Sequence, residues 1–143
     1  MILVDANLLL YAYNASAPEH ESARAWLEDA LSGAEPVAFS WPVLLAFIRI
    51  ATNSRAFPHP LSRLEATAAV SSWLDQPQAV VLSPGERHWE LLQQLLSEGK
   101  VVGPLVSDAH LAALTIEHGG TLVTTDRDFT RFPKLKFKNP IEP

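Results

Sequence analysis

The chain has 143 residues, a formal net charge of −5 and no cysteine. Its length suits a single domain over 1–143, and the lack of cysteine excludes disulfides, thiolate nucleophiles and cysteine-bound zinc. The negative charge argues against broad, non-specific binding to nucleic acid, because such binding depends on lysine and arginine side chains that neutralise phosphates.

Short apolar runs and helical patterns alternate in the first half of the chain. The run before Asp5 predicts a buried strand, and the apolar residues after it predict a helix. Pro42 suits the first turn of a later helix, where its missing N–H costs nothing, and Ser40 or Trp41 would cap that helix. The expected elements are a strand at 1–4, helices at 6–13 and 18–31, a strand at 36–40, and a helix from the Pro42 turn to about residue 52.

The same alternation continues in the second half, after a proline-rich loop at 53–60. Ser83 is the expected cap of the next-to-last helix, whose apolar face includes Trp89 and which Gly99 ends. The expected elements are a helix at 61–74, a strand at 78–82, a helix opening at 83–86, a helix at 107–118, a strand at 121–125 and a further strand at 135–137.

Alternating strands and helices are typical of an α/β fold, here with a mainly parallel sheet of four to five strands sandwiched by helices. No apolar stretch is long enough to span a bilayer, and no secretion signal precedes Asp5, so we expect a cytoplasmic protein without membrane contact. In such sheets, ligands bind beyond the carboxyl ends of the strands.

Four aspartates converge on that edge of the predicted sheet. Asp5 and Asp126 each follow a strand, Asp108 opens a helix from the same rim, and Asp128 lies two residues beyond Asp126. Taken singly, each could simply cap a helix. Taken together, they would repel by roughly 4 kcal/mol per pair at about 4 Å and an effective dielectric near 20, unless a cation offset the charge. Oxygen ligands favour Mg²⁺ or Mn²⁺, so the joint pattern predicts a metal-dependent hydrolase of phosphate esters.

Polar residues near these aspartates allow two interpretations each. Asn7 could cap a turn or hold Asp5 in position. Thr124 and Thr125 are either ordinary strand residues or hydroxyls that bond a ligand carboxylate or water at the site. Arg49 lies among apolar neighbours and therefore needs a partner, either a clustered aspartate or a substrate phosphate.

The histidines give only a weak signal for zinc, because no pair of them has the spacing of metal ligands. His110 lies two residues beyond Asp108 and points away from it on the helix, so we expect a half-buried or surface imidazole. His20, His88 and His118 are expected to be structural.

Three segments resemble PIN-domain ribonucleases, in particular the VapC toxins of bacterial toxin–antitoxin pairs. They are LVDANLLLYA at 3–12, SDAHLAAL at 107–114 and TTDRDF at 124–129, in this order. The segment SWPVLLAFIRIATN at 40–53 resembles the mycobacterial-type branch of these toxins. The resemblance covers nearly the whole chain, and it is the three motifs in order that make it specific.

This resemblance implies a parallel sheet between helices and endonucleolytic cleavage of RNA that depends on Mg²⁺ or Mn²⁺. Asp5, Asp108 and Asp126 would bind the metal, and Asp126 or Asp128 would orient the attacking water. The resemblance also implies a homodimer and inhibition by a VapB-type antitoxin, whose basic side chain would enter the acidic site. The net charge of −5 suits a basic partner.

One position departs from the family pattern. PIN domains usually carry an additional acidic ligand, a glutamate, where this chain has Ala46. The loss of that carboxylate favours one metal over two. It also leaves open an alternative function, in which the chain is a catalytically weakened PIN-like module that binds RNA or protein. Phosphatases that use an aspartate nucleophile fit less well, because they need Asp-x-Asp where this chain has Asp5, Ala6 and Asn7.

Overall fold

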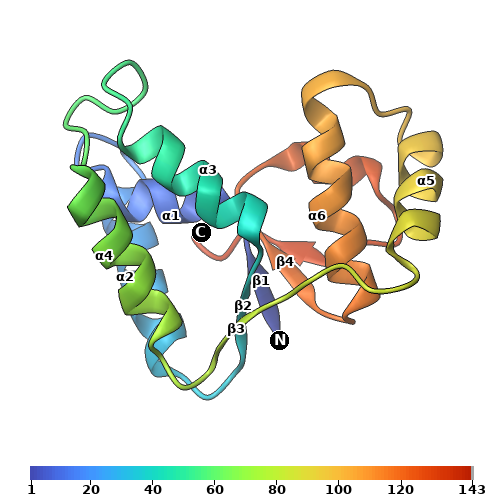
Figure 1. Ribbon diagram of the computed structural model, residues 1–143, viewed down its shortest axis with the longest axis horizontal. Helices are drawn as coiled ribbons and strands as arrows, with labels where there is room; N and C mark the ends of the chain where they lie inside the picture. Colours follow the sequence, from blue (N-terminus) through green and yellow to red (C-terminus); the bar gives the residue numbers. More distant parts are fainter. Residues whose placement is uncertain (143) are drawn as a thin grey trace.

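The computed structural model describes residues 1–142, in which one parallel sheet lies between two groups of helices (Figure 1). The sheet order is β3-β2-β1-β4-β5, and every neighbouring pair of strands is parallel. This confirms the expected α/β fold and puts the first strand at the centre of the sheet. The strands are β1 (Ile2–Val4), β2 (Val37–Phe39), β3 (Ala79–Val81), β4 (Thr121–Val123) and β5 (Phe137–Lys138).

In Figure 1 the first four helices lie on one side of the sheet and the last two lie on the other. None of the helices within residues 1–142 is both long enough and apolar enough to cross a membrane. The α-helices are α1 (Ala6–Tyr13), α2 (His20–Ser32), α3 (Trp41–Ala51), α4 (Arg63–Leu74), α5 (His88–Glu98) and α6 (Val106–Glu117), and the 3₁₀ helices are η1 (Gly103–Leu105) and η2 (Arg127–Arg131).

Two helices on the first side begin at serine caps. The Ser40 hydroxyl accepts a hydrogen bond from the Val43 N–H at 3.3 Å, and Pro42 lies in the first turn, as the sequence predicts. Ser62 and Glu65 form a reciprocal capping box at the start of α4. These caps satisfy N–H groups that the helix itself leaves free, and they fix where α3 leaves the sheet.

The prediction for the start of α5 was wrong. The helix begins at His88 after Arg87, whose side chain makes no capping bond, and Ser83 lies outside it. The Ser83 carbonyl instead accepts a hydrogen bond from His118 Nε2 at 2.9 Å. The prediction that Trp89 lies on the apolar face of this helix was also wrong, because Trp89 is 63% exposed while its neighbour His88 is buried. The last strand begins at residue 137 rather than 135.

The core on the α1–α4 side is built around Trp73, which is 1% exposed. Its ring stacks on Phe39 at 5.9 Å and meets Phe47 edge-on at 4.8 Å, measured between ring centroids. Its indole Nε1 donates to the Tyr13 hydroxyl at 3.1 Å, so the polar end of this large side chain is also satisfied. The cluster joins α1, α3 and α4 to β2.

We expect Trp73→Ala to lower the free energy of unfolding by about 3–5 kcal/mol, because it removes a fully buried indole and leaves a cavity. Chemical denaturation monitored by far-UV circular dichroism measures this. Leu64→Ala is the matched control on the same helix: Leu64 is 78% exposed, and its truncation should change stability by less than about 0.5 kcal/mol. Equal losses in the two variants would contradict the assignment of this core.

Candidate metal centre

The pairing of β1 with β4 sets the position of the first aspartate. Val4 pairs with Val123, so Asp5 and Thr124 leave their strands side by side at the carboxyl edge of the sheet. The backbone N–H of Asp5 donates to the Val123 carbonyl at 3.0 Å, which extends the ladder by one bond. Strand register therefore brings together residues that are far apart in the sequence.

Thr124 is the centre of a hydrogen-bond network at this edge. Its hydroxyl donates to Asp5 Oδ2 at 2.7 Å and accepts from the backbone N–H of Asp126 at 3.0 Å. The amide nitrogen of Asn7 also donates to this hydroxyl at 3.3 Å. The other Asp5 oxygen accepts from the Ala6 N–H at 2.7 Å, so Asp5 both caps α1 and faces the site. Asp5 is therefore both a helix cap and a member of the acidic site, and one role does not exclude the other.

Three carboxylates gather closely beside this network. Oxygen atoms of Asp108, Asp126 and Asp128 all lie within 4.8 Å of one another. Asp126 caps η2 by accepting the Asp128 N–H at 2.8 Å, which aims the two side chains from one turn. Asp108 caps nothing, because α6 already begins at Val106 and places Asp108 within its first turn.

Asp5 and Asp108 carry the electrostatic cost of this arrangement. Burial raises the pKa of Asp108 to about 6, and the nearby charges of Asp126, Asp5 and Asp128 add to the effect. Burial also raises the pKa of Asp5, against the opposing hydrogen bonds from Thr124 and Ala6. The charged forms of these groups are thus disfavoured in the folded chain, as expected where carboxylates converge without a cation.

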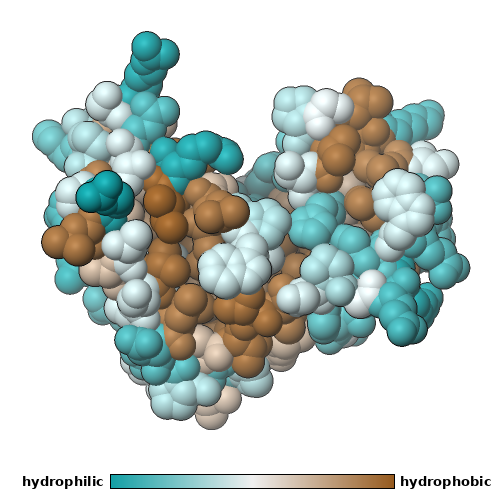
Figure 2. Space-filling model, viewed as in Figure 1, coloured by the Kyte–Doolittle hydropathy of each residue, from teal (hydrophilic) through white to brown (hydrophobic). Residues whose placement is uncertain are grey.

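A hollow of about 430 Å³ opens onto these aspartates between α3 and α6. Figure 2 shows the surface notched between the parts of the molecule that carry these two helices. Asp5 and Asp108 are the acidic side chains in its lining, and Arg49 and His110 also line it. Ala46 also lines it, so the usual glutamate position faces the site but supplies no carboxylate here.

The other residues singled out from the sequence have different outcomes. Asn7 reaches Asp5 only through Thr124. Thr125 makes no side-chain hydrogen bond within residues 1–142, so Thr124 is the hydroxyl that orders the site. Arg49 is exposed and makes no ion pair with the part of the chain that the structure describes. Of the two partners considered for it, a clustered aspartate is therefore not paired with Arg49 within residues 1–142, while its position in the hollow leaves it available to a phosphate.

The donor atoms at this edge suit a hard divalent cation. Three converging carboxylates are the ligand chemistry that Mg²⁺ and Mn²⁺ prefer over softer metals. Asn7 Oδ1 is buried and finds no donor within residues 1–142, although a buried acceptor normally has one. Such an acceptor is expected where the complete site includes ordered water. Asp5 lies just outside the group of three, held by Thr124 and Ala6 for a shared or supporting role.

Sequence reasoning missed a second polar network next to the hollow. His88 Nδ1 lies 3.3 Å from Glu117 Oε1, and His88 Nε2 lies 3.0 Å from His110 Nδ1. Burial and then His88 lower the pKa of His110. Burial alone would raise the pKa of Glu117, but the Gly85 N–H and His88 outweigh it and lower the pKa. The spacing of His110 and Glu117, on one face of one helix two turns apart, is the signal that could have linked them.

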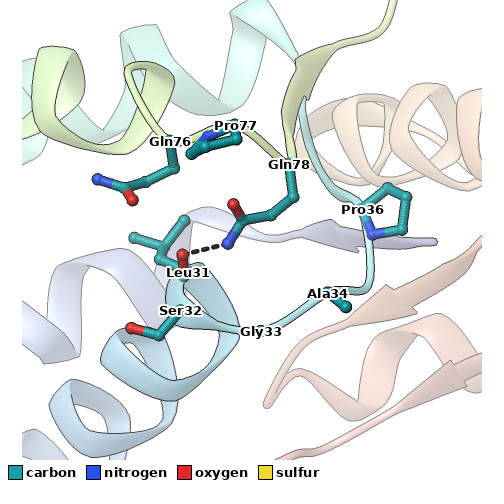
Figure 3. A pocket seen from close by; sticks show the side chains of 8 residues that line it. All are labelled: Leu31, Ser32, Gly33, Ala34, Pro36, Gln76, Pro77 and Gln78. Carbon is teal, nitrogen blue, oxygen red and sulfur yellow. Dashed lines mark hydrogen bonds between the residues drawn. The ribbon is translucent and has the colours of Figure 1, made fainter.

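A larger hollow lies at the opposite edge of the sheet, before β2 and β3 (Figure 3). It measures about 580 Å³ and has no ionisable side chain in its lining. In Figure 3, the Gln78 side chain bonds the Leu31 carbonyl and so satisfies the end of α2. This hollow lies beside the end of α2, and it has no charged groups that could bind a metal or catalyse a reaction as the aspartates could.

Comparisons with known proteins identify the family and the fold. The family model of the PIN domain matches residues 2–135. Ribonuclease VapC37 of Mycobacterium tuberculosis is 45% identical over 140 residues, which cover 98% of this chain and 97% of that protein. The fold is also similar to VapBC2 from Rickettsia felis bound to a promoter DNA fragment, with a TM-score of 0.69, 22% identity, and 97% and 98% of the two chains covered. VapC20 of Mycobacterium tuberculosis, a toxin that cleaves the sarcin-ricin loop, has a TM-score of 0.67 at 20% identity, with 91% and 93% covered.

We expect Asp108→Asn to stabilise the metal-free protein at pH 8 but not at pH 4. The pKa of Asp108 is raised to about 6 from 3.8, so stability is lost as pH rises through that window, and the neutral asparagine avoids the loss. Asp108 is only partly buried and solvent screens it, so we expect a rise in Tm of about 2–4 °C, roughly 1 kcal/mol in a chain of this size. Thermal unfolding in EDTA at both pH values measures it.

Glu86→Gln removes one exposed negative charge outside the cluster and serves as the control. It should leave Tm nearly unchanged at both pH values. A variant Asp108→Asn that is less stable than wild type at pH 8 would show that the carboxylates do not strain the folded chain.

Proposed function

The chain belongs to the PIN-domain family, among the VapC ribonucleases, and we propose that it is a metal-dependent endoribonuclease of a toxin–antitoxin pair. The observation that carries the proposal is the convergence of Asp108, Asp126 and Asp128 beside Asp5 at the carboxyl edge of the sheet. Relatives named as VapC ribonucleases, similar over nearly their full length, support RNA as the substrate.

Asp108, Asp126 and Asp128 would hold the cation, and Asp5 would complete or support its coordination. A bound Mg²⁺ or Mn²⁺ supplies Lewis-acid chemistry, which activates water for attack on phosphorus and offsets charge on the leaving oxygen. Thr124 fixes Asp5 and the turn that carries Asp126. The ends of β1 and β4 are thus held together, so movement of Asp5 would also disturb the turn that carries Asp126 and Asp128.

Arg49 and the walls of the hollow would position the RNA strand. The Arg49 guanidinium is exposed and lines the same hollow as Asp5 and Asp108. A free guanidinium in the same hollow as the carboxylates suits a phosphate neighbouring the one that is cut. It would compensate for the acidic character of the site, which by itself repels a polyanion.

The similarity to solved toxin–antitoxin complexes is also the basis for the partners that we propose. Structural neighbours include toxin–antitoxin complexes, so we propose a VapB-type antitoxin as partner and a homodimer as the assembled toxin. The surface carries apolar side chains suited to such contacts: Figure 2 shows brown atoms gathered around α3 and β3. Trp41, Leu45 and Val80 are 54%, 58% and 39% exposed there. Exposed aromatic and aliphatic side chains in one region mark protein–protein contacts.

Ala46 supports a second candidate, a PIN-like module that binds RNA or protein and cleaves weakly. The lining of the hollow has no acidic side chain from α3 that would replace the usual glutamate. A cleavage assay with purified, antitoxin-free protein separates the two functions, because binding without metal-dependent cleavage would favour the module.

We expect Asp108→Asn and Asp5→Asn each to lower metal-dependent RNA cleavage by about 100-fold or more, since loss even of supporting residues around a metal commonly costs about 10–100-fold. The measurement is cleavage of a radiolabelled RNA pool in Mn²⁺ and in EDTA. Mn²⁺ at 100 times its Kd should also stabilise the wild type by about 2.7 kcal/mol, and this gain should shrink in Asp108→Asn.

Glu86→Gln again provides a control with the same change in charge, and it should cleave as the wild type does. If Asp5→Asn or Asp108→Asn cleaved RNA at the wild-type rate in Mn²⁺, the proposed metal centre would be ruled out.

We expect Trp41→Arg to convert the dimer to a monomer at micromolar concentration, because it replaces an exposed aromatic anchor with a charge that the other subunit would have to bury. Sedimentation velocity measures the change. Leu64→Arg is the control, since Leu64 is exposed on α4 and should not affect assembly. Dissociation by Leu64→Arg alone would place the interface elsewhere.

A further inference from the structure

Two histidines and a glutamate form a chain of contacts that ends at the hollow. Glu117 closes α6, His88 opens α5, and His110 lies two turns before Glu117 on the same helix. His88 bridges the other two, at 3.3 Å from Glu117 Oε1 and 3.0 Å from His110 Nδ1. The His88 and Glu117 side chains are each 11% exposed, whereas His110 lines the hollow together with Asp108 and Arg49. The half-buried His110 imidazole is therefore held at the hollow by two largely buried side chains, His88 and Glu117.

The support is built around the Glu117 carboxylate. The Gly85 N–H lies 3.0 Å from both Glu117 oxygens. A Cβ at residue 85 would lie 2.6 Å from Glu117 Oε2, so a side chain here would displace the carboxylate from this contact. This contact fixes Glu117 against the turn that precedes α5, and through it fixes His88.

The direction of each hydrogen bond follows from the carboxylate. Glu117 can only accept, so His88 Nδ1 carries the proton and donates to it. In an uncharged His88, Nε2 then accepts, and His110 Nδ1 must be the donor in the 3.0 Å contact. His110 Nε2 is left with a lone pair and makes no hydrogen bond within residues 1–142. With His88 uncharged, the network presents a hydrogen-bond acceptor from the wall of the hollow.

An acceptor at this position selects among the groups of a nucleic-acid strand. Phosphate oxygens accept and cannot bond it, and a deoxyribose offers no donor along the backbone. The ribose 2′-hydroxyl is the one backbone group that donates, and it distinguishes RNA from DNA. We propose that His110 accepts a hydrogen bond from a ribose 2′-hydroxyl next to the cleaved phosphate, and that His88 and Glu117 are its positioning residues. The proposal rests on the proposed ribonuclease function.

A purely structural role would have a different signature. If the network only fastened α5 to α6, its loss would lower stability and would slow cleavage of every substrate by the same factor. Contact with a 2′-hydroxyl instead makes the effect of the variant depend on that single hydroxyl. A comparison of matched substrates thus separates the two roles, because only interacting groups show non-additive losses.

The experiment begins with wild-type protein, Mn²⁺ and a pool of random RNA, whose products define a cleaved sequence. That oligonucleotide is then synthesised with ribose, and with a single 2′-deoxy substitution at each position around the cleaved bond. We expect one 2′-deoxy position to lower kcat/KM of the wild type by about 3- to 10-fold, the range of a single hydrogen bond. His110→Ala should lower kcat/KM on the all-ribose substrate by the same factor and should be insensitive to that 2′-deoxy substitution.

Three further variants sharpen the result. His110→Gln keeps an acceptor near the position of Nε2 and should recover part of the 2′-deoxy sensitivity. Glu117→Gln removes the carboxylate that orients His88 and should reduce the sensitivity without removing the imidazole. His118→Ala is the matched control, since His118 contacts the Ser83 carbonyl beyond the end of α6 and should retain the full wild-type sensitivity.

The outcomes separate this proposal from the one on which it rests. If the wild type cleaves RNA but His110→Ala keeps the full 2′-deoxy effect, the contact is refuted while the ribonuclease function stands. Equal slowing of all substrates together with a lower Tm would assign the network to helix packing and would overturn the proposal. Failure of the wild type to cleave any RNA would remove the ribonuclease function, and the 2′-hydroxyl contact with it.

Discussion

The arrangement of Asp5 and Asp126 at the carboxyl edge of the sheet depends on the hydrogen bonds of the Thr124 hydroxyl. This hydroxyl receives the Asp126 N–H and the Asn7 amide while it donates to Asp5, so one oxygen connects β1, α1 and the turn after β4. It can do so only because β1 and β4 are parallel and in register at Val4 and Val123. Strand pairing therefore positions Asp5 against Thr124, and the turn at η2 and the first turn of α6 bring in the other carboxylates.

The close placement of the carboxylates lowers the stability of the metal-free protein and favours the binding of a cation. Burial and mutual repulsion disfavour charge on Asp5 and Asp108. The hydrogen bonds from Thr124 and Ala6 oppose this effect on Asp5, and the charge of Arg131 opposes it on Asp108. A folded chain that keeps such groups together holds them ready for a cation, which regains the electrostatic cost when it binds. The aromatic core around Trp73, on the α1–α4 side of the sheet, contributes stability that offsets the repulsion between the carboxylates.

Much of this could be predicted from the sequence, and the failures have definite causes. The alternation of strands and helices determined the sheet and its carboxyl edge, and hence the meeting of the four aspartates. Whether Thr124 or Thr125 faces Asp5 could not be predicted, because that depends on the register between two strands over a hundred residues apart. Arg49 lies among apolar residues in the sequence, but that pattern could not show that α3 exposes part of its apolar surface, where Leu45 is itself 58% exposed. The spacing of His110 and Glu117 on α6 places these two on one face, but the contact of His88 with both arises from the packing of α5 on α6, which has no local pattern in the sequence.

The shortness of the outer strands has a consequence for how copies of this chain can associate. The two edges of the sheet are β3, with three residues, and β5, with two. Edges this short expose few free backbone groups, so they offer a poor template for sheet extension between molecules or for fibril growth. Ordered assembly must then depend on complementary side-chain faces. Copies of this chain at high concentration would thus have little tendency to join through their strands.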